Sequence, residues 1–548
     1  MCLSLVFPAS ALFADEHATV KVDTPVIYIA GDSINLGYDN DSKMFCIDTF
    51  FDLFKSGASD TSTVVQTAAS ILAPMILKGV IFDEWDDYYD AVYNEIYDAT
   101  KPVLLDKNGD VCTDCGVRSW EKKEMDYDRT HDVGAVNGDG LYGEMDYQFY
   151  YDWRLDPLEI VDELHSYVQD IKAVTGKDKV CIEAKCLGCN VLLAYLYKYG
   201  TEDLKGVALN VPTSLGADFL DGVLNGELGI DGNAIGRFLT SEAYAGSKDT
   251  VLAEFLDSVL SVLEDSGVFD GMSDTFRKVL YSKIEYGVFS AVARSTLLTF
   301  PGYWGMVGYD AFDGALNYIY GNEGSELRNE YAGMIDKISF FNENIKKNAL
   351  SIFGSLKDAG VNVAVISKYG IQLAPVIKDG NVLADEYVSV SRSSLGATTA
   401  DVYGTLSDEY IAERTAQGYG KYISPDKKID ASTCLFPEST WFVKGNTHAF
   451  DSHDEGNIMV TVMAADKQLT VDDFELGRFV VYHQDIDVSE NMTESNCGKD
   501  YLGADYAEDK PGTLSEKKES RLKNIFRFVK ALILFLVYNV FPKLINKA

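Results

Sequence analysis

Basic residues are scarce in this sequence. Its 548 residues include 48 Lys and Arg against 85 Asp and Glu, so the formal net charge is −37 at pH 7. A chain this acidic repels the phosphate backbone, which excludes nucleic acid as an expected partner. The same charge favours solubility outside the cell. With 47% hydrophobic and 12% aromatic residues, the composition is that of a folded protein.

Cysteine is sparse as well. Nine Cys form an odd, scattered set, which argues against a dense disulfide scaffold. Cys112 and Cys115 form a C-x-x-C pair, but no second pair stands at a spacing suited to zinc. Residues 106–117 imitate the start of a calcium loop, yet lack the Gly and Glu that such a loop requires. We therefore expect no metal and no other cofactor, and these two thiols are either free or joined locally.

The N-terminus lacks the basic residues that usually open an export signal. Residues 1–14 are apolar and rich in small residues, and they run into Asp15, Glu16 and His17. This pattern fits the hydrophobic region and cleavage site of a signal peptide. The alternative is a disordered or buried tail. We expect a signal peptide remnant over 1–14 and an extracytoplasmic location.

The C-terminus lacks a charge-free run long enough to span a bilayer comfortably. The apolar run covers 531–541, and extending it back to Ile525 takes in Arg527 and Lys530. Those two residues share a helical stripe with Lys523, so the first half of the segment is amphipathic. We expect an acidic linker over 486–520 and a helix over 521–548 that anchors the chain to the cell-surface membrane. Its orientation stays open, and a buried core helix is the alternative.

Hydrophobic runs suited to buried strands recur along the rest of the chain, whereas strand patterns are scarce from 216 to 345. Such runs, in alternation with helical patterns, are the parts of a parallel α/β sheet. The sequence therefore predicts an α/β core in two parts, 15–215 (with a lid-like insertion over 80–145) and 346–485, and a helical cap over 216–345. The expected strands cover residues 24–30, 180–182, 204–211, 361–367 and 439–443.

The clearest local pattern lies at residues 180–200. A short apolar strand turns sharply at 184–188 and continues as an amphipathic helix. A strand, a tight turn of small residues and a helix are the setting of a nucleophile elbow, G-x-S-x-G. Here Ala184 stands for the first Gly, Cys186 stands for the Ser, and Gly188 is kept. The sequence thus predicts an elbow whose nucleophile is a thiol.

The helix that follows would act on this thiol. A helix N-terminus presents backbone N–H groups and a positive dipole end, which lowers the pKa of a thiol, so we expect Cys186 to favour the thiolate. The N–H of Leu187 would form half of an oxyanion hole. An N–H in the turn after the first strand, that of Asp32, would form the other half.

A base and an acid are also needed. The chain has only six His, and His448 and His453 follow the strand expected at 439–443. Asp385 falls on the loop after the strand expected at 361–367. The order nucleophile, acid, His along the chain is that of α/β-hydrolases. We expect Cys186, Asp385 and His448 to act together, with His453 as the alternative base.

These residues resemble a known family, the α/β-hydrolases related to lecithin:cholesterol acyltransferase. The run Tyr151-Asp152-Trp153-Arg154-Leu155 is similar to the family's YDWRL signature, and residues 187–193 are similar to its elbow continuation. Residues 212–216 stand where the family has a turn that contains Pro and Gly. Tyr369-Gly370, with Asp385 downstream, matches the region that carries the family's acid. The resemblance covers roughly residues 25–453. It implies an α/β-hydrolase core with a cap, and acyl hydrolysis or transfer on a lipid-like ester. Asp152 and Arg154 are expected to be a buried structural pair.

The sequence departs from that family at four positions of the proposed site. Cys186 replaces the Ser, Ala184 the first Gly, Lys185 the usual His, and Glu386 the Gly after the acid. A Cys-His-Asp hydrolase or acyltransferase at the cell surface is our expectation. The alternatives are an inactive hydrolase fold kept for binding, and thiol–disulfide chemistry or a plain disulfide at the C-x-x-C formed by Cys186 and Cys189.

Overall fold

The computed structural model describes part of the chain in detail. The expected signal peptide, most of the lid-like insertion, residues 228–297 of the expected cap and the C-terminal anchor lie outside this part. Within it, no helix combines the length and the hydrophobicity needed to cross a bilayer. The described residues are 23–39, 42–45, 101–117, 145–227, 298–371, 373, 377, 382–402, 404–483 and 488–497.

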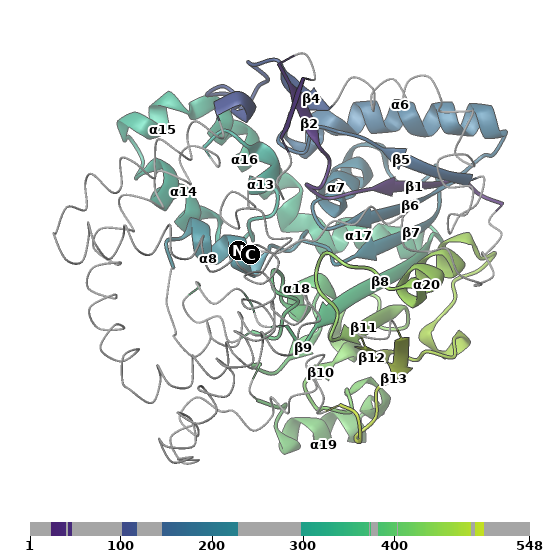
Figure 1. Ribbon diagram of the computed structural model, residues 1–548. Coiled ribbons are helices and arrows are strands. Elements are labelled where there is room, and N and C mark those ends of the chain that lie inside the picture. The colour runs from purple at the N-terminus through teal and green to yellow at the C-terminus, as the bar shows by residue number, and fades with distance from the viewer. Residues whose placement is uncertain are drawn as a thin grey trace, which may run out of the picture.

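A large, mostly parallel sheet forms the centre of the molecule (Figure 1). Eight strands of the described residues pair in it, all parallel except the edge strand β13, which runs antiparallel to β12. The protein therefore has an α/β fold. In spatial order the strands are β13 (Val488–Asn491), β12 (Phe479–His483), β11 (Thr440–Lys444), β8 (Asn362–Tyr369), β7 (Leu204–Asn210), β6 (Val180–Lys185), β1 (Val26–Ile29) and β5 (Asp146–Phe149).

The central strands are buried on both faces. Every residue of β6 and of β8 is buried, which is why their sequences read as nearly continuous apolar runs. Because the strands are parallel, the loops that leave β1, β6, β7, β8 and β11 all emerge at one edge of the sheet. Ligands of open α/β sheets bind at this carboxyl edge.

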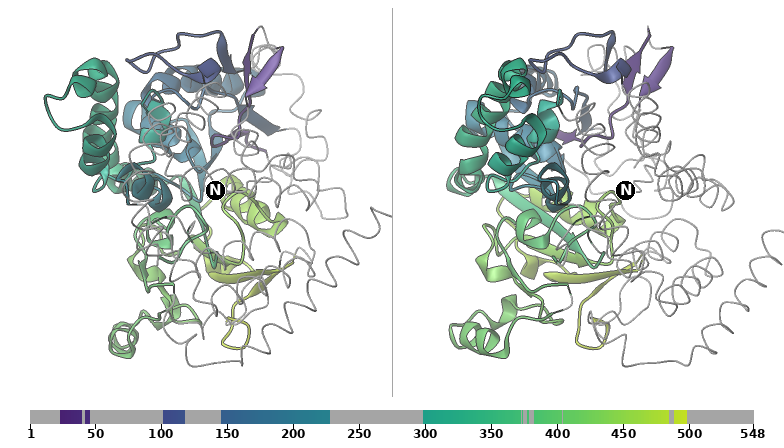
Figure 2. Two further views of the ribbon diagram at one scale, coloured as in Figure 1. Left: turned by 60° about the vertical axis from the view of Figure 1, so that its left-hand side comes forward. Right: turned by 90° about the vertical axis from the view of Figure 1, so that its left-hand side faces the viewer.

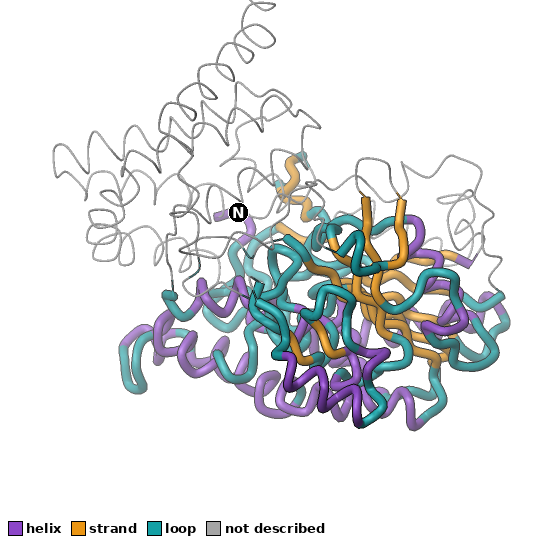
Figure 3. Tube along the Cα trace, turned by 90° about the horizontal axis from the view of Figure 1, so that it is seen from below, coloured by secondary structure: helices purple, strands orange, loops and turns teal. Residues whose placement is uncertain are grey.

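Helices cover both faces of the sheet, as the coloured tube in Figure 3 shows from below. On one face, Ile27, Ile182 and Val365 belong to the same hydrophobic cluster as residues of α6, α7 and α17. On the other face, Ala208 and Trp441 pack in a cluster with residues of α20. These four helices are α6 (Pro157–Thr175), α7 (Gly188–Tyr199), α17 (Ala349–Asp358) and α20 (His453–Ala464).

The described part of the expected cap is helical. Its helices gather on one side of the sheet in Figures 1 and 2, away from α19 at the opposite end. They are α8 (Asp218–Leu224), α13 (Pro301–Trp304), α14 (Phe312–Tyr320), α15 (Glu326–Glu330) and α16 (Ala332–Asn344). Short helices also follow β8 along the chain, namely α18 (Val390–Ser393) and α19 (Asp408–Ala416). The 3₁₀ turns are η3 (Lys101–Val103), η6 (Lys346–Asn348), η7 (Gly420–Tyr422), η8 (Ala431–Thr433) and η9 (Val471–Asp473).

Two small sheets complete the described fold. The first sheet has three strands, in the spatial order β3 (Lys43–Phe45), β2 (Leu36–Tyr38) and β4 (Cys115–Val117). The second sheet pairs β9 (Thr398–Thr399) with β10 (Ile429–Asp430). The first is tied to the core by Arg154, which is fully buried. Its guanidinium donates to the carbonyls of Val103 and Cys115 and pairs with Asp152 at 2.6 Å. Asp152 and Arg154 are therefore the buried structural pair that the sequence predicts.

The five strands expected from hydrophobic runs are present, with ends shifted by a few residues. The edge strand β5 does not stand out in the sequence, because DYQF mixes polar and apolar residues. Part of the linker predicted over 486–520 is a strand instead, since Val488–Asn491 forms β13. This segment is polar and mostly exposed, as an edge strand can be, so its hydrophobic pattern is weak.

Candidate active site

The expected elbow lies at the carboxyl end of β6. Cys186 has a φ of 51°, in the left-handed region, and its N–H donates to the carbonyl of Asn210 on β7 at 3.0 Å. The helix α7 begins two residues later, at Gly188. A Cβ at Gly188 would lie 2.2 Å from the carbonyl oxygen of Ile29 and 2.7 Å from that of Ala30. Only glycine therefore lets α7 start against the end of β1.

Gly188→Ala is expected to lower the free energy of unfolding by about 3 kcal/mol, because the added methyl must push β1 and α7 apart. Chemical denaturation of both forms measures the difference. Gly354→Ala is the matched control, since a Cβ on this α17 residue meets nothing within 4 Å. Equal losses in the two variants would show that the contact with β1 is unimportant.

The Cys186 thiol is enclosed, with 8% of the residue exposed. Burial raises its pKa well above the usual value, and the nearby Asp32 carboxylate raises it further. The backbone N–H of Leu187 acts in the opposite direction, but burial outweighs it. The expectation of a favoured thiolate is therefore wrong: the start of α7 does supply an N–H, but the loss of water around the sulfur has the larger effect.

The two cysteines of the C-x-x-C at the elbow do not form a disulfide with each other. Cys189 is fully buried, its Sγ donates to the carbonyl of Ala184 at 3.1 Å, and both Cys186 and Cys189 are free thiols. Cys112 and Cys115 are free as well. Within the described residues the structure therefore contains neither of the local disulfides that the sequence left open.

Asp385 and His448 meet at the same edge of the sheet. His448 Nδ1 lies 2.8 Å from Asp385 Oδ2, and Asp385 Oδ1 accepts the N–H of Val388 at 2.8 Å. Asp385 is fully buried, whereas 14% of the His448 side chain is exposed. His448 Nε2 is buried, and no described group lies within hydrogen-bonding distance of it. This nitrogen is therefore the one that a reacting group could use.

The acid–histidine pair lies in the neighbourhood of the thiol. The charge of Asp385 is among those that raise the pKa of Cys186, after burial and Asp32. The ring of Tyr387 packs on that of His448, with ring centroids 5.3 Å apart. Glu386, which stands where the resembled family has Gly, adopts a φ of 85°. The backbone after the acid thus keeps a conformation that favours glycine. The other candidate base, His453, is the first residue of α20.

The turn after β1 packs directly on Cys186. A Cβ at Gly31 would lie 3.3 Å from Cys186 Cβ, so this turn and the elbow are in contact. Tyr151 donates its hydroxyl to the carbonyl of Ala30 at 2.6 Å, and Trp153 donates its indole N–H to that of Ile34 at 2.9 Å. The YDWRL run therefore holds both ends of the turn that carries Asp32.

One residue of this region escapes sequence reasoning. Tyr303, in helix α13 of the expected cap, donates its hydroxyl to Asp32 Oδ2 at 3.1 Å. Burial, followed by the charge of Asp32, raises its pKa well above the usual value, so it stays a neutral donor. No motif signals this contact, because Tyr303 and Asp32 are far apart in the sequence and meet only through the fold.

A cluster of charges, partly buried at Asp451 and fully buried at Lys368, supports the loop that carries His448. Asp451, three residues after the histidine, accepts hydrogen bonds from the ends of three adjacent strands. The donors are Lys185 Nζ of β6 at 2.6 Å, Asn210 Nδ2 of β7 at 3.0 Å and Lys368 Nζ of β8 at 2.8 Å. Burial raises the pKa of Asp451, but the two lysines outweigh it and lower the pKa overall.

The same lysines also bind the backbone of that loop. Lys185 Nζ donates to the carbonyl of Ala449 at 2.6 Å, and Lys368 Nζ donates to that of Phe450. Lys185 directly precedes Cys186, so one residue links the elbow to the histidine loop. The lysine that replaces the His of the resembled family thus has a structural partner.

Glu183 of β6 is buried beside this cluster. Burial, and then the charge of Asp451, raises its pKa from 4.5 to about 8. The folded chain therefore holds a proton that the unfolded chain releases between these two pH values. As a result, the free energy of unfolding falls as the pH rises through this window.

In the wild type this fall in the free energy of unfolding should amount to about 1.4 kcal/mol for each unit by which folding raises the pKa of Glu183. Glu183→Gln is expected to abolish it, because the amide does not titrate. Urea unfolding of both forms at the two ends of the window measures it. Glu163→Gln, an exposed substitution on α6, is the control and should keep the wild-type slope. A wild-type slope in Glu183→Gln would contradict the assignment.

The described residues contain no group of three or more His, Cys, Asp or Glu side chains that could hold a metal ion. The turn that imitates a calcium loop binds its own backbone: Asp106 Oδ1 accepts the N–H groups of Asn108 at 2.7 Å and Asp110 at 3.0 Å. An acid–histidine pair near a thiol is an arrangement that can assist nucleophilic attack by that thiol.

Comparisons with known proteins give little help. No protein-family model and no curated protein matches the chain. A solved structure titled "The crystal structure of Tle4-Tli4 complex" is similar over 63% of this chain and 75% of that chain, with 12% sequence identity and a TM-score of 0.26. This likeness is too weak to establish a shared fold.

Proposed function

We propose that this protein is an α/β-hydrolase that cleaves or transfers the acyl group of lipid-like esters, with Cys186 as nucleophile, His448 as general base and Asp385 as the acid that orients it. The observation that carries the proposal is the state of His448. Its Nδ1 is bound to buried Asp385 at 2.8 Å, and its Nε2 is left without a described partner. A base oriented by an acid is what an acyl-transfer nucleophile requires.

The strand order supports the same assignment. The elbow follows β6, Asp385 follows β8 and His448 follows β11, and these strands lie next to one another with only β7 between β6 and β8. The order nucleophile, acid, histidine is that of α/β-hydrolases. The YDWRL run and the elbow continuation resemble the lecithin:cholesterol acyltransferase-like members of that fold, which suggests a lipid ester as substrate.

The raised pKa of Cys186 determines how the proposed reaction begins. The sulfur attacks the ester carbonyl as its proton passes to His448 Nε2, because a free thiolate is disfavoured in this enclosed site. The carbonyl oxygen becomes an oxyanion, which the N–H groups of Leu187 and Asp32 bind. When the C–O bond breaks, the leaving alkoxide takes the proton from His448 and a thioester remains on Cys186.

The second half of the reaction mirrors the first. Water or an acceptor alcohol attacks the thioester carbon and gives its proton to His448 Nε2. The C–S bond then breaks, the sulfur recovers that proton, and a carboxylic acid or a new ester leaves. Throughout, Asp385 keeps Nδ1 protonated and the ring oriented. Export and attachment to the cell-surface membrane through residues 521–548, which would bring the site to lipid, are part of the proposal.

Acyl trapping tests this function. The full chain is mixed with a short-chain and a long-chain p-nitrophenyl ester and quenched in acid, and the cysteine peptides are weighed by mass spectrometry. We expect an acyl thioester on the Cys186 peptide and none there in Cys186→Ala. Cys112 is exposed and serves as the internal control for uncatalysed acylation. Turnover without a Cys186 adduct, or no turnover in any form, would refute the proposal.

A second function, a binding protein that keeps the fold without catalysis, is favoured by one observation. Burial and the Asp32 carboxylate both disfavour negative charge on Cys186. The variant Cys186→Ser separates the two functions, because a hydroxyl relies on a general base in the same way as a neutral thiol. Turnover that exists only in Cys186→Ser would indicate an intact site with a disabled nucleophile, and hence the binding role.

A further inference from the structure

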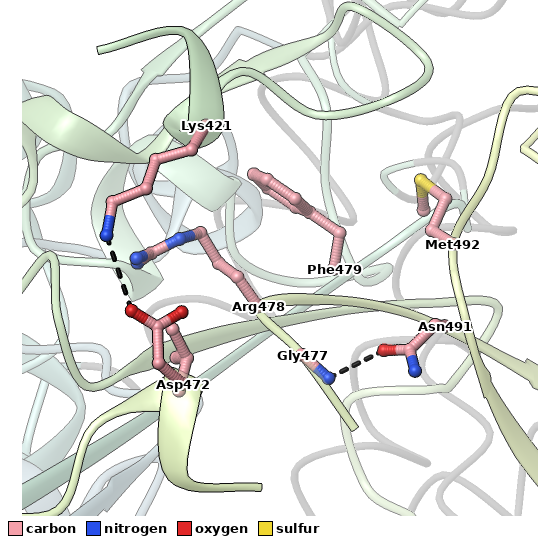
Figure 4. A pocket seen from close by; sticks show the side chains of 8 residues that line it. Lys421, Asp472, Gly477, Arg478, Phe479, Asn491 and Met492 are labelled. Atoms are coloured by element: carbon pink, nitrogen blue, oxygen red, sulfur yellow. Dashed lines mark hydrogen bonds and ion pairs between the residues drawn. The ribbon is translucent and has the colours of Figure 1, made fainter. Parts of the chain in front are cut away.

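A cavity lies at the other end of the strands from the proposed catalytic groups. Its volume is about 230 Å³, and it opens beside Gly477, Arg478 and Phe479, where β12 begins. His448, in contrast, follows the carboxyl end of β11, which runs parallel to β12. The remaining lining residues are Lys421, Val471, Asp472, Asn491 and Met492, from η7, η9 and the end of β13 (Figure 4).

Arg478 is the unusual member of this lining. Its side chain is 5% exposed, and among the described residues no hydrogen-bond acceptor lies within reach of its buried Nη1. The nearest carboxylate is that of Glu438, with Oε2 3.8 Å from Nη2, which is too long for a hydrogen bond. The face of the guanidinium is covered by the ring of Tyr422, whose centroid lies 4.5 Å from Cζ.

Leaving the buried Nη1 of Arg478 without an acceptor is costly, because its N–H groups have lost water without gaining a partner. Burial lowers the pKa of Arg478, which reflects the same deficit. An anion that enters the cavity would remove this cost by supplying the missing acceptor oxygens. Carboxylates bind arginine in this way, through N–H···O bonds to one or both oxygens.

The other polar groups of the lining already have partners. Lys421 Nζ lies 3.3 Å from Asp472 Oδ2, and the N–H of Gly477 donates to Asn491 Oδ1 at 2.6 Å (Figure 4). In the same view Phe479 and Met492 line the opposite side from Lys421 and Asp472. The cavity thus offers one unsatisfied cationic group together with an apolar wall.

We propose that this cavity binds a small carboxylate that carries a short apolar chain, with its oxygens on Arg478 and its chain against Phe479 and Met492. The apolar wall favours such a ligand over inorganic phosphate, which presents oxygens on every side. The site is separate from the proposed hydrolase site, and its ligand binds whether or not the chain cleaves esters.

Hexanoate is the probe, and 1-hexanol and inorganic phosphate are the comparison ligands. Binding to the full chain is followed by calorimetry and by the methyl resonance of Met492, assigned through Met492→Leu. We expect saturable hexanoate binding that shifts this resonance, and binding weaker by about 10- to 100-fold in Arg478→Gln, where the charged hydrogen bonds are lost. Lys427→Gln removes a charge from an exposed lysine outside the cavity and is the matched control.

Each other outcome overturns the proposal. Equal binding of hexanol would show that the carboxylate is not recognised, and tighter binding of phosphate would show that the apolar wall is not used. A hexanoate signal that leaves Met492 unmoved would place the ligand elsewhere. Arg478→Met gives an independent readout, since an apolar side chain in place of an unsatisfied cation should leave the unliganded protein at least as stable. A marked loss of stability in Arg478→Met would indicate a purely structural arginine.

Discussion

Turnover of acyl esters is expected to fall about ten-thousand-fold when Asp385 is replaced by Asn, as the loss of an orienting carboxylate does in a hydrolase triad. Asp385 is fully buried, and its Oδ2 accepts from His448 Nδ1 at 2.8 Å. An amide can present its NH₂ group to Nδ1 instead. That contact favours the tautomer that carries its proton on Nε2, and this nitrogen can then no longer accept the proton of Cys186.

Steady-state kinetics measure the effect. We expect kcat to fall with little change in KM, because the substituted group orients the base and does not touch the substrate. Asp401→Asn, an exposed carboxyl on the same stretch of chain, is the matched control and should leave both constants unchanged. A similar kcat in Asp385→Asn and in the wild type would exclude Asp385 as the orienting acid.

Asp451→Asn is expected to cost about 3–5 kcal/mol of stability, the range for removing one partner of a buried ionic group. The change leaves Lys185 and Lys368 without their shared carboxylate, and Lys368 is fully buried. It also releases the loop that carries His448, so kcat should fall as well. Chemical denaturation and ester kinetics on the same preparation give both numbers.

The control for this second prediction is Asp466→Asn. Asp466 is fully exposed, and its carboxylate lies 3.8 Å from Lys205, so its removal should change the free energy of unfolding by no more than about 1 kcal/mol. Replacing Asp451, Lys185 and Lys368 together by apolar residues separates the two roles of the cluster. Stability should then recover while kcat stays low, because the histidine loop is still detached. Recovery of both would show that the cluster does not position His448.

The pH dependence of stability has contributions of opposite sign at this cluster. The lowered pKa of Asp451 adds stability above its usual pKa, and this stability is lost as the pH falls. The raised pKa of Glu183 adds stability that is lost as the pH rises toward about 8. The described cluster is therefore expected to favour the folded state most at mildly acidic pH.

Much of the core could be predicted from the sequence, because strands that are buried on both faces of a sheet have nearly continuous apolar sequences. Five strands show such apolar runs, which are typical of a parallel sheet covered by helices on both faces. They lie around residues 26–29, 180–185, 204–210, 362–369 and 440–444. The edge strands β5 and β13 could not be predicted in the same way. Their exposure at the rim permits polar residues, so their sequences resemble loops.

The elbow could be predicted because it is local. Ala184, Cys186 and Gly188 lie within five positions, and their spacing alone defines a strand, a strained turn and a helix start. The state of the thiol could not be predicted from the same residues. The start of α7 is encoded nearby, but the burial and the Asp32 charge that raise the pKa of Cys186 come from segments far away in the chain.

The sequence by itself thus determined the α/β core and the strand, turn and helix at residues 180–199, because each rests on neighbours along the chain. Only the tertiary structure decided which groups meet: Asp385 with His448, Tyr303 with Asp32, and Asp451 with Lys185 and Lys368. These contacts join residues that are about 60 to 270 positions apart in the sequence. Local rules of periodicity and spacing do not reach over such separations. Parallel strands bring such distant loops to one edge of the sheet, and it is there that charge and burial set the chemistry.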